Sequence, residues 1–139
     1  MSMRVISHLV VHCTATAQTA TVAAIQRHWR ETLKWRAMGY HVLITPDGTA
    51  HRLAPDTAIC NGVAGYNSHS LHVSYIGGVD SRGRAIDNRT EAQKATLLRV
   101  LTEWKRQYPK AVIQGHRDFA GVRKACPSFN AKAEYAGVK

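Results

Sequence analysis

Residues 5–13 constrain the fold of this chain more than any other segment. The run is rich in β-branched residues and is apolar on both faces for most of its length. A strand with this pattern belongs in the centre of a sheet covered by helices, because a sheet open on one side would expose half of these side chains. The run therefore predicts an α/β domain in which His12 stands near the end of a central strand.

The rest of the chain alternates between helical and extended patterns. Residues 21–37 repeat apolar positions at steps of three and four, which predicts an amphipathic helix capped by Thr19 or Thr21 and ended by Gly39. Further expected elements are a hairpin over residues 40–45 and 49–53, a surface loop over 56–70, a strand over 71–76, a helix opened by a capping box at 90–93, and a strand over 111–114. We expect a central mixed β-sheet flanked by helices.

Length and composition are those of one ordinary globular domain, which we expect to span residues 1–139. The chain is 45% hydrophobic and 20% charged, far from the charge-dominated composition of disordered chains. No window approaches the ~18 consecutive apolar residues of a membrane span. The first residues are typical of a strand and lack a convincing cleavage site, so they do not indicate a signal peptide.

The charge balance favours an anionic partner. Lysine and arginine outnumber aspartate and glutamate by 19 to 9, which gives a net charge of +10. Nucleic acid, anionic lipid and bacterial envelope polymers would all be attracted to such a surface. The basic residues are scattered and are not interleaved with aromatic residues in a recognition spacing, so a solvated basic surface that aids solubility is the alternative.

His12, His116 and Cys126 form a candidate zinc site in a groove at the strand ends. Three cysteines cannot form a complete disulfide set, which leaves free thiols or a metal-bound thiolate. Zinc prefers nitrogen and sulfur ligands, and a catalytic site uses three of them and leaves one position for water. Eight histidines offer many other triples, however, so spacing alone does not single out this set.

A series of short motifs resembles one known family. In chain order they are Val-His-Cys-Thr-Ala-Thr at 11–16, Gly-Tyr-His-Val-Leu-Ile at 39–44 with Asp-Gly-Thr at 47–49, Gly-Tyr-Asn at 65–67, Gly-Gly at 77–78, Gly-His-Arg-Asp at 115–118 and Lys-Ala-Cys-Pro-Ser-Phe at 124–129. They resemble the type 2 N-acetylmuramoyl-L-alanine amidases, which include the T-odd phage lysozymes and share a fold with peptidoglycan recognition proteins. The matches follow the family's order over nearly the whole chain.

The resemblance implies roles for particular residues. The family's zinc ligands fall on His12, His116 and Cys126, its catalytic tyrosine on Tyr40, and its essential lysine on Lys124. We also expect His41, Asn67 and Val63 to bind substrate. Asp118 is expected either to orient a ligand histidine or to pair with Arg117, since zinc histidines usually donate their other ring nitrogen to a carboxylate or a carbonyl.

The implied activity is zinc-dependent hydrolysis of the amide bond between N-acetylmuramic acid and L-alanine in bacterial peptidoglycan. Zinc lowers the pKa of bound water toward about 7, so a nucleophile is available near neutral pH. Lys124 is suited to stabilise developing negative charge, and Tyr40 to donate a hydrogen bond or relay a proton. We expect a monomeric phage or prophage endolysin that is made in the host cytoplasm and acts on the cell wall after release.

Two segments depart from the family pattern. Many relatives carry Gly-x-His-Ala before the Gly-Tyr-Asn motif, whereas residues 61–64 here are Asn-Gly-Val-Ala. His72 stands where a small residue is usual. Because that loop contacts the glycan or stem peptide in relatives, Val63 and His72 predict an altered floor of the substrate groove.

Two other functions remain open on the sequence alone. One is a non-catalytic protein that recognises wall fragments or regulates a protein partner. Such recognition relatives typically lack the zinc cysteine, so Cys126 together with Tyr40 and Lys124 favours catalysis. The other is a nucleic-acid-binding domain, for which salt-sensitive retention on DNA without wall activity would be the signature. We expect no nucleic-acid partner.

Overall fold

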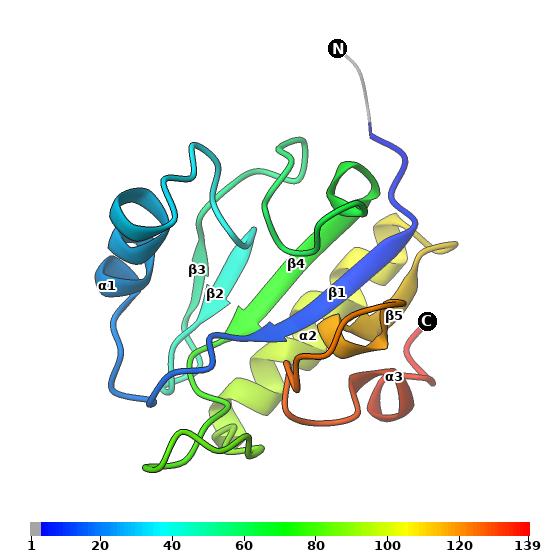
Figure 1. The fold of residues 1–139 in the computed structure, drawn as a ribbon. Helices are drawn as coiled ribbons and strands as arrows, with labels where there is room; N and C mark the ends of the chain where they lie inside the picture. The colour runs from blue at the N-terminus through cyan, green and yellow to red at the C-terminus, as the bar shows by residue number, and fades with distance from the viewer. Residues whose placement is uncertain (1–3) are drawn as a thin grey trace.

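The computed structural model describes residues 4–139 and shows a five-stranded sheet with helices packed around it (Figure 1). The strands are β1 (His8–Cys13), β2 (Val42–Ile44), β3 (Ala50–Arg52), β4 (Ser70–Tyr75) and β5 (Val112–Gly115), and the α-helices are α1 (Val22–Arg27), α2 (Glu91–Gln107) and α3 (Ala131–Glu134). The strand order is β3-β2-β4-β1-β5. Among these strands β2 and β3 pair antiparallel and the other neighbouring pairs are parallel, so the expected mixed sheet is confirmed.

The central strand β1 is buried on both faces, as its sequence predicts. Leu9, Val10 and Val11 are all fully buried. Leu9 and Val11 belong to the main core between the sheet and α2, which runs behind the strands in Figure 1. Val10 points to the opposite face and packs against Val63 and Phe119 from two loops. This second face also carries His12.

The capping box expected at the start of α2 is present. The N–H of Gln93 donates to Thr90 Oγ1 at 3.0 Å, and the N–H of Thr90 donates to Gln93 Oε1 at 3.0 Å. The Gln93 amide also donates to the carbonyl groups of Ile44 and Ile76, each at 3.1 Å. One buried side chain therefore begins the helix and joins it to the sheet.

The first helix is shorter than its apolar pattern predicts. Thr21 caps α1 as expected, but α1 is followed by one π-helical turn at His28–Thr32 and then by irregular chain. Lys34 takes a positive φ of 59°, and the N–H of Trp35 donates to the Trp29 carbonyl at 2.9 Å. The two indole rings then lie stacked, with centroids 6.4 Å apart. The predicted helix over residues 33–37 is wrong because the chain folds back to pair these rings.

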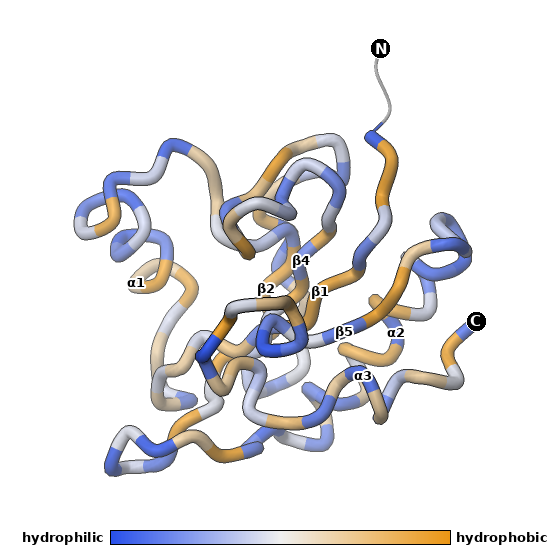
Figure 2. Tube along the Cα trace, turned by 45° about the vertical axis from the view of Figure 1, so that its right-hand side comes forward, coloured by the Kyte–Doolittle hydropathy of each residue, from blue (hydrophilic) through white to orange (hydrophobic). Residues whose placement is uncertain are grey.

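The remaining elements follow the sequence closely. Strands β2 and β3 form the expected hairpin, and the chain between β3 and β4 is mostly loop with one short 3-10 turn at Asn67–His69. Hydrophobic residues follow the central strands, whereas many outer loops are hydrophilic (Figure 2). Within residues 4–139, no helix is both long enough and apolar enough to cross a bilayer.

Candidate metal centre and active site

Two neighbouring parallel strands bring two histidines to the same edge of the sheet. His12 lies near the end of β1, and His116 directly follows β5. The register pairs Val11 with Gly115, which are the residues that precede the two histidines. The rings of His12 and His116 consequently lie side by side, with centroids 4.9 Å apart.

The loop after β5 returns Cys126 to these histidines. The N–H of Arg117 donates to the Cys126 carbonyl at 2.9 Å, and the N–H of Cys13 donates to Cys126 Sγ at 3.2 Å. Gly115 permits this approach, since a Cβ at that position would lie 2.6 Å from Cδ of Pro127. Packing therefore explains the glycine of the Gly-His-Arg-Asp motif, because a side chain at position 115 would collide with the loop that carries Cys126.

The three side chains have the geometry of a metal site. Their candidate ligand atoms all lie within 4.8 Å of one another. His12 Nδ1 lies 3.7 Å from Cys126 Sγ, and tetrahedral zinc with ordinary bond lengths would hold such a pair about 3.6 Å apart. Three protein ligands leave one tetrahedral position open, as in catalytic sites. The structure thus brings together the three residues that the sequence predicts as ligands, and they fit a metal ion.

The environment keeps both histidines in the form that binds a metal. Burial, with added repulsion from neighbouring groups that include His116 and Lys124, holds the pKa of His12 well below its ordinary value. Burial and the charge of Lys124 lower the pKa of His116 to about 4. A hydrogen bond with Cys13, together with burial, raises the pKa of the Cys126 thiol. At neutral pH both imidazoles are neutral, whereas the thiol must lose a proton to bind a metal.

Tyr40 and Lys124 lie in the same hollow as the three candidate ligands. The Tyr40 ring packs against the His12 ring at a centroid distance of 4.9 Å, and its hydroxyl donates to the Cys13 carbonyl at 3.3 Å. Burial raises the pKa of Tyr40, so its hydroxyl stays protonated at neutral pH. Lys124 is exposed at the rim. A proton donor and a cation therefore flank the candidate metal centre.

The candidate metal centre opens into a longer groove. The hollow that contains the candidate ligands has a volume of about 170 Å³. A neighbouring hollow of about 660 Å³ shares Trp35, Gly62 and Lys124 with it and continues past Asn67 and Arg123. Since the two hollows share walls, they form one groove, and an extended chain lying in it would pass the candidate metal centre.

The residues expected to bind substrate lie in different environments. Asn67 and Val63 line the larger hollow, although the Val63 side chain is almost fully buried. His41 is completely buried. Its Nε2 donates to the Ala58 carbonyl at 2.8 Å, and its Nδ1 accepts from the N–H of His72 at 3.0 Å. His41 therefore has no surface with which to touch a substrate, and its role in this structure is to join β4 to the loop after β3.

The partner of a candidate ligand histidine is not the residue that the sequence suggested. Asp118 Oδ2 accepts from the N–H of Gly115 at 2.8 Å, so Asp118 stabilises the turn that carries His116. His72 Nδ1, in contrast, lies 2.9 Å from His12 Nε2. Sequence reasoning missed this contact, although it singled out His72 as a departure from the expected family pattern. His72 is fully buried and lies beneath the groove.

Comparison with known proteins settles the family. The sequence matches N-acetylmuramoyl-L-alanine amidase over residues 2–129. The chain belongs to this amidase family. The endolysin of Klebsiella phage KP32 is 41% identical to the amidase over 127 residues, which cover 91% of this chain and 83% of the endolysin. The endolysin of Escherichia phage T7 is 35% identical over 125 residues, which cover 89% of this chain and 82% of that protein.

Solved structures agree with this assignment. The endolysin of the Thermus scotoductus MAT2119 bacteriophage Ph2119 superposes on 98% of the amidase, over 86% of its own chain, with a TM-score of 0.81 and 26% identity. Drosophila PGRP-LB superposes on 97% of it, over 82% of its own chain, with a TM-score of 0.76 and 16% identity, which shows a shared fold. The expected amidase family and fold are both confirmed.

Proposed function

We propose that this amidase uses zinc, held by His12, His116 and Cys126, to cut the bond between N-acetylmuramic acid and L-alanine in bacterial peptidoglycan. The observation that carries this proposal is the cluster of two imidazoles and one thiol at one end of the groove, beside Tyr40 and Lys124. Bound zinc supplies Lewis acidity and activates water for attack on the amide carbonyl.

Two side chains beside the cluster are suited to the remaining steps. The Lys124 cation would stabilise the negative charge that develops on the carbonyl oxygen. Tyr40 keeps its proton at neutral pH because burial raises its pKa. Its hydroxyl can therefore donate a hydrogen bond to the same oxygen or pass a proton toward the leaving alanine nitrogen.

The biological role that fits best is that of a phage or prophage endolysin. Four relatives that match 89% to 91% of this chain, at 35% to 41% identity, carry that name. A net charge of +10 would attract the protein to the anionic envelope. We propose that it works as a monomer on the cell wall, after release from the cytoplasm of the host.

The direct test compares two cysteine variants on purified peptidoglycan. Cys126→Ser removes a proposed ligand, whereas Cys60→Ser changes a buried thiol outside the cluster. Release of new L-alanine amino termini should fall by more than about 100-fold in Cys126→Ser, since loss of even an outer partner of a ligand costs about 10–100-fold. The Cys60 variant should retain most activity. Equal activity of the two variants would refute the proposed ligand set.

A second pair of variants tests the roles of the flanking groups. Tyr40→Phe and Lys124→Met should each lower kcat by about 100-fold or more, because each removes a group that acts in the transition state. Lys110→Met, at an exposed position before β5, is the matched control and should retain activity. A wild-type protein that binds the wall but releases no L-alanine termini with zinc present would instead be a recognition protein.

A further inference from the structure

His72 has no role in the proposed amidase reaction, yet it contacts a candidate metal ligand. It lies in β4, is fully buried, and pairs in register with Val10 of β1. Its Nδ1 is 2.9 Å from His12 Nε2, and its Nε2 is 3.0 Å from Asn67 Oδ1. A buried ring with both nitrogens in hydrogen bonds joins a candidate metal ligand to a loop side chain.

The direction of every hydrogen bond in this series follows from one backbone group. The N–H of Val63 can only donate, and it donates to Asn67 Oδ1 at 2.7 Å. That oxygen is an acceptor for His72 as well, so His72 Nε2 carries a proton and its Nδ1 presents a lone pair. His12 Nε2 must then donate to His72.

These hydrogen bonds determine which nitrogen of His12 can bind a metal. With its proton on Nε2, the neutral His12 ring has its lone pair on Nδ1. Nδ1 is the nitrogen that lies 3.7 Å from Cys126 Sγ. The buried hydrogen bonds therefore select the tautomer of His12 that can bind a metal beside the thiolate.

We propose that His72 and Asn67 are positioning residues that fix the tautomer and ring orientation of His12 for metal binding. Metal-binding histidines commonly donate their second ring nitrogen to a carboxylate or a carbonyl. In this chain a neutral imidazole accepts that hydrogen bond, and a side-chain amide in turn orients the imidazole. This inference rests on the proposed metal site and adds two residues to it.

Gly62 explains how the ring fits there. A Cβ at position 62 would lie 2.2 Å from His72 Nδ1 and 2.3 Å from its Cε1. A side chain at position 62 and the His72 ring therefore compete for one space. Glycine at position 62 therefore leaves free the space that the His72 ring occupies.

The experiment measures the affinity of the purified protein for Zn²⁺ alone by competition with a chromogenic chelator. His72→Phe keeps a ring but offers no acceptor, and His72→Asn places an amide oxygen near the position of Nδ1. We expect His72→Phe to weaken Zn²⁺ binding by about 10–100-fold and His72→Asn to recover much of that loss. A role limited to packing would give the opposite order, because phenylalanine preserves more of the ring volume.

Two variants of the half-buried Asn67 test the same role independently, in case the His72 variants fail to fold. Asn67→Ala removes the acceptor for His72, whereas Asn67→Asp keeps an oxygen there. We expect weaker Zn²⁺ binding in the alanine variant and near-normal binding in the aspartate variant. Thermal unfolding of the chelated proteins shows which variants are folded.

Substitutions at position 62 test whether a side chain there competes with the His72 ring for space. Gly62→Ala should weaken Zn²⁺ binding when His72 is present, but should have little further effect in a His72→Ala background, because the space is then free. Wild-type affinity in folded His72→Phe and Asn67→Ala variants would overturn the positioning role while leaving the metal site intact. A wild-type protein without affinity for Zn²⁺ would refute the metal site itself, and the positioning role with it.

Discussion

The protonation of three side chains determines when the candidate site can bind a metal. His12 and His116 are already neutral at weakly acidic pH, since burial lowers the pKa of both and places that of His116 near 4. Cys126, in contrast, is not ready to bind a metal, because its raised pKa keeps the thiol protonated. Metal binding near pH 6 should therefore release one proton, and that proton comes from sulfur.

A pH series of Zn²⁺ affinities tests this assignment. Between pH 5 and 6.5 the dissociation constant should fall by about tenfold for each unit of increasing pH, because one thiol proton competes with the metal. If the histidines had ordinary pKa values near 6.5, they would also lose protons and the dependence would be steeper. A slope near two or three would contradict the low pKa values of His12 and His116.

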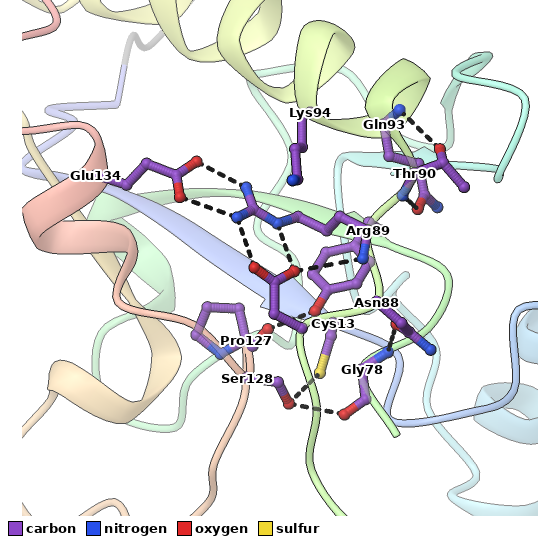
Figure 3. A network of polar contacts seen from close by, with 12 residues as sticks. Cys13, Gly78, Asn88, Arg89, Thr90, Gln93, Lys94, Pro127, Ser128 and Glu134 are labelled. Carbon is purple, nitrogen blue, oxygen red and sulfur yellow. Dashed lines mark hydrogen bonds and ion pairs between the residues drawn. The ribbon is translucent and has the colours of Figure 1, made fainter. Parts of the chain in front are cut away.

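Among the helices and loops, Arg89 forms a clasp with Asp87 and Glu134 close to the loop that carries Cys126 (Figure 3). The buried Arg89 guanidinium donates to both carboxylate oxygens of Glu134 in α3, at 2.8 and 2.9 Å, and to Asp87 at 2.9 Å. Its Cζ lies 3.4 Å from the centre of the Phe129 ring. Because Phe129 follows Cys126 by only three residues, this clasp ties the segment before α2 to the loop that carries the sulfur.

Loss of the clasp should destabilise the fold. We expect Arg89→Met to lower the free energy of unfolding of the chelated protein by about 2 kcal/mol, since it removes the buried guanidinium that donates to the partly exposed carboxylates of Glu134 and Asp87. Lys94→Met breaks an exposed pair with Glu91 and is the control, with an expected loss below about 1 kcal/mol. Urea unfolding measures both values. Equal losses in the two variants would show that the clasp does not stabilise the fold.

The clasp also predicts that the stability of the fold depends on pH. The hydrogen bonds from Arg89 hold the pKa of Glu134 and of Asp87 below their ordinary values. A carboxyl group with a lowered folded-state pKa stabilises the fold above its unfolded pKa of about 4.3 for glutamate, and this contribution is lost as the pH falls through the folded-state value. The wild-type advantage over Glu134→Gln should be complete at pH 6 and shrink below about pH 4. An advantage independent of pH would contradict this.

For the molecule as a whole, the net charge of +10 predicts how the amidase meets its substrate. Attraction between scattered exposed cations and an anionic wall is screened by salt over about 10 Å at 0.1 M. The rate of wall lysis should therefore fall as salt is raised from 0.05 to 0.5 M, whereas cleavage of a small neutral muramoyl-peptide should change little. Equal salt dependence for the two substrates would contradict a role for surface charge in reaching the wall.

Much of this molecule can be predicted from its sequence, and the exceptions share a cause. The central strand, the capping box of α2 and the hairpin depend on local patterns, and these predictions are confirmed. The end of the first helix depends on the stacking of Trp29 on Trp35. The spacing of apolar residues along the sequence does not reveal this contact. The contact of His72 with His12 depends on the register between β4 and β1, and a single sequence does not reveal that register.

The proposed wall amidase activity depends on a metal held by His12, His116 and Cys126. The most direct measurement combines the metal content of the purified protein with release of L-alanine amino termini before chelation, after chelation and after return of zinc. We predict one zinc ion per chain, loss of activity on its removal and recovery on its return. Full activity in a protein shown to be free of metal would contradict the proposed dependence on zinc.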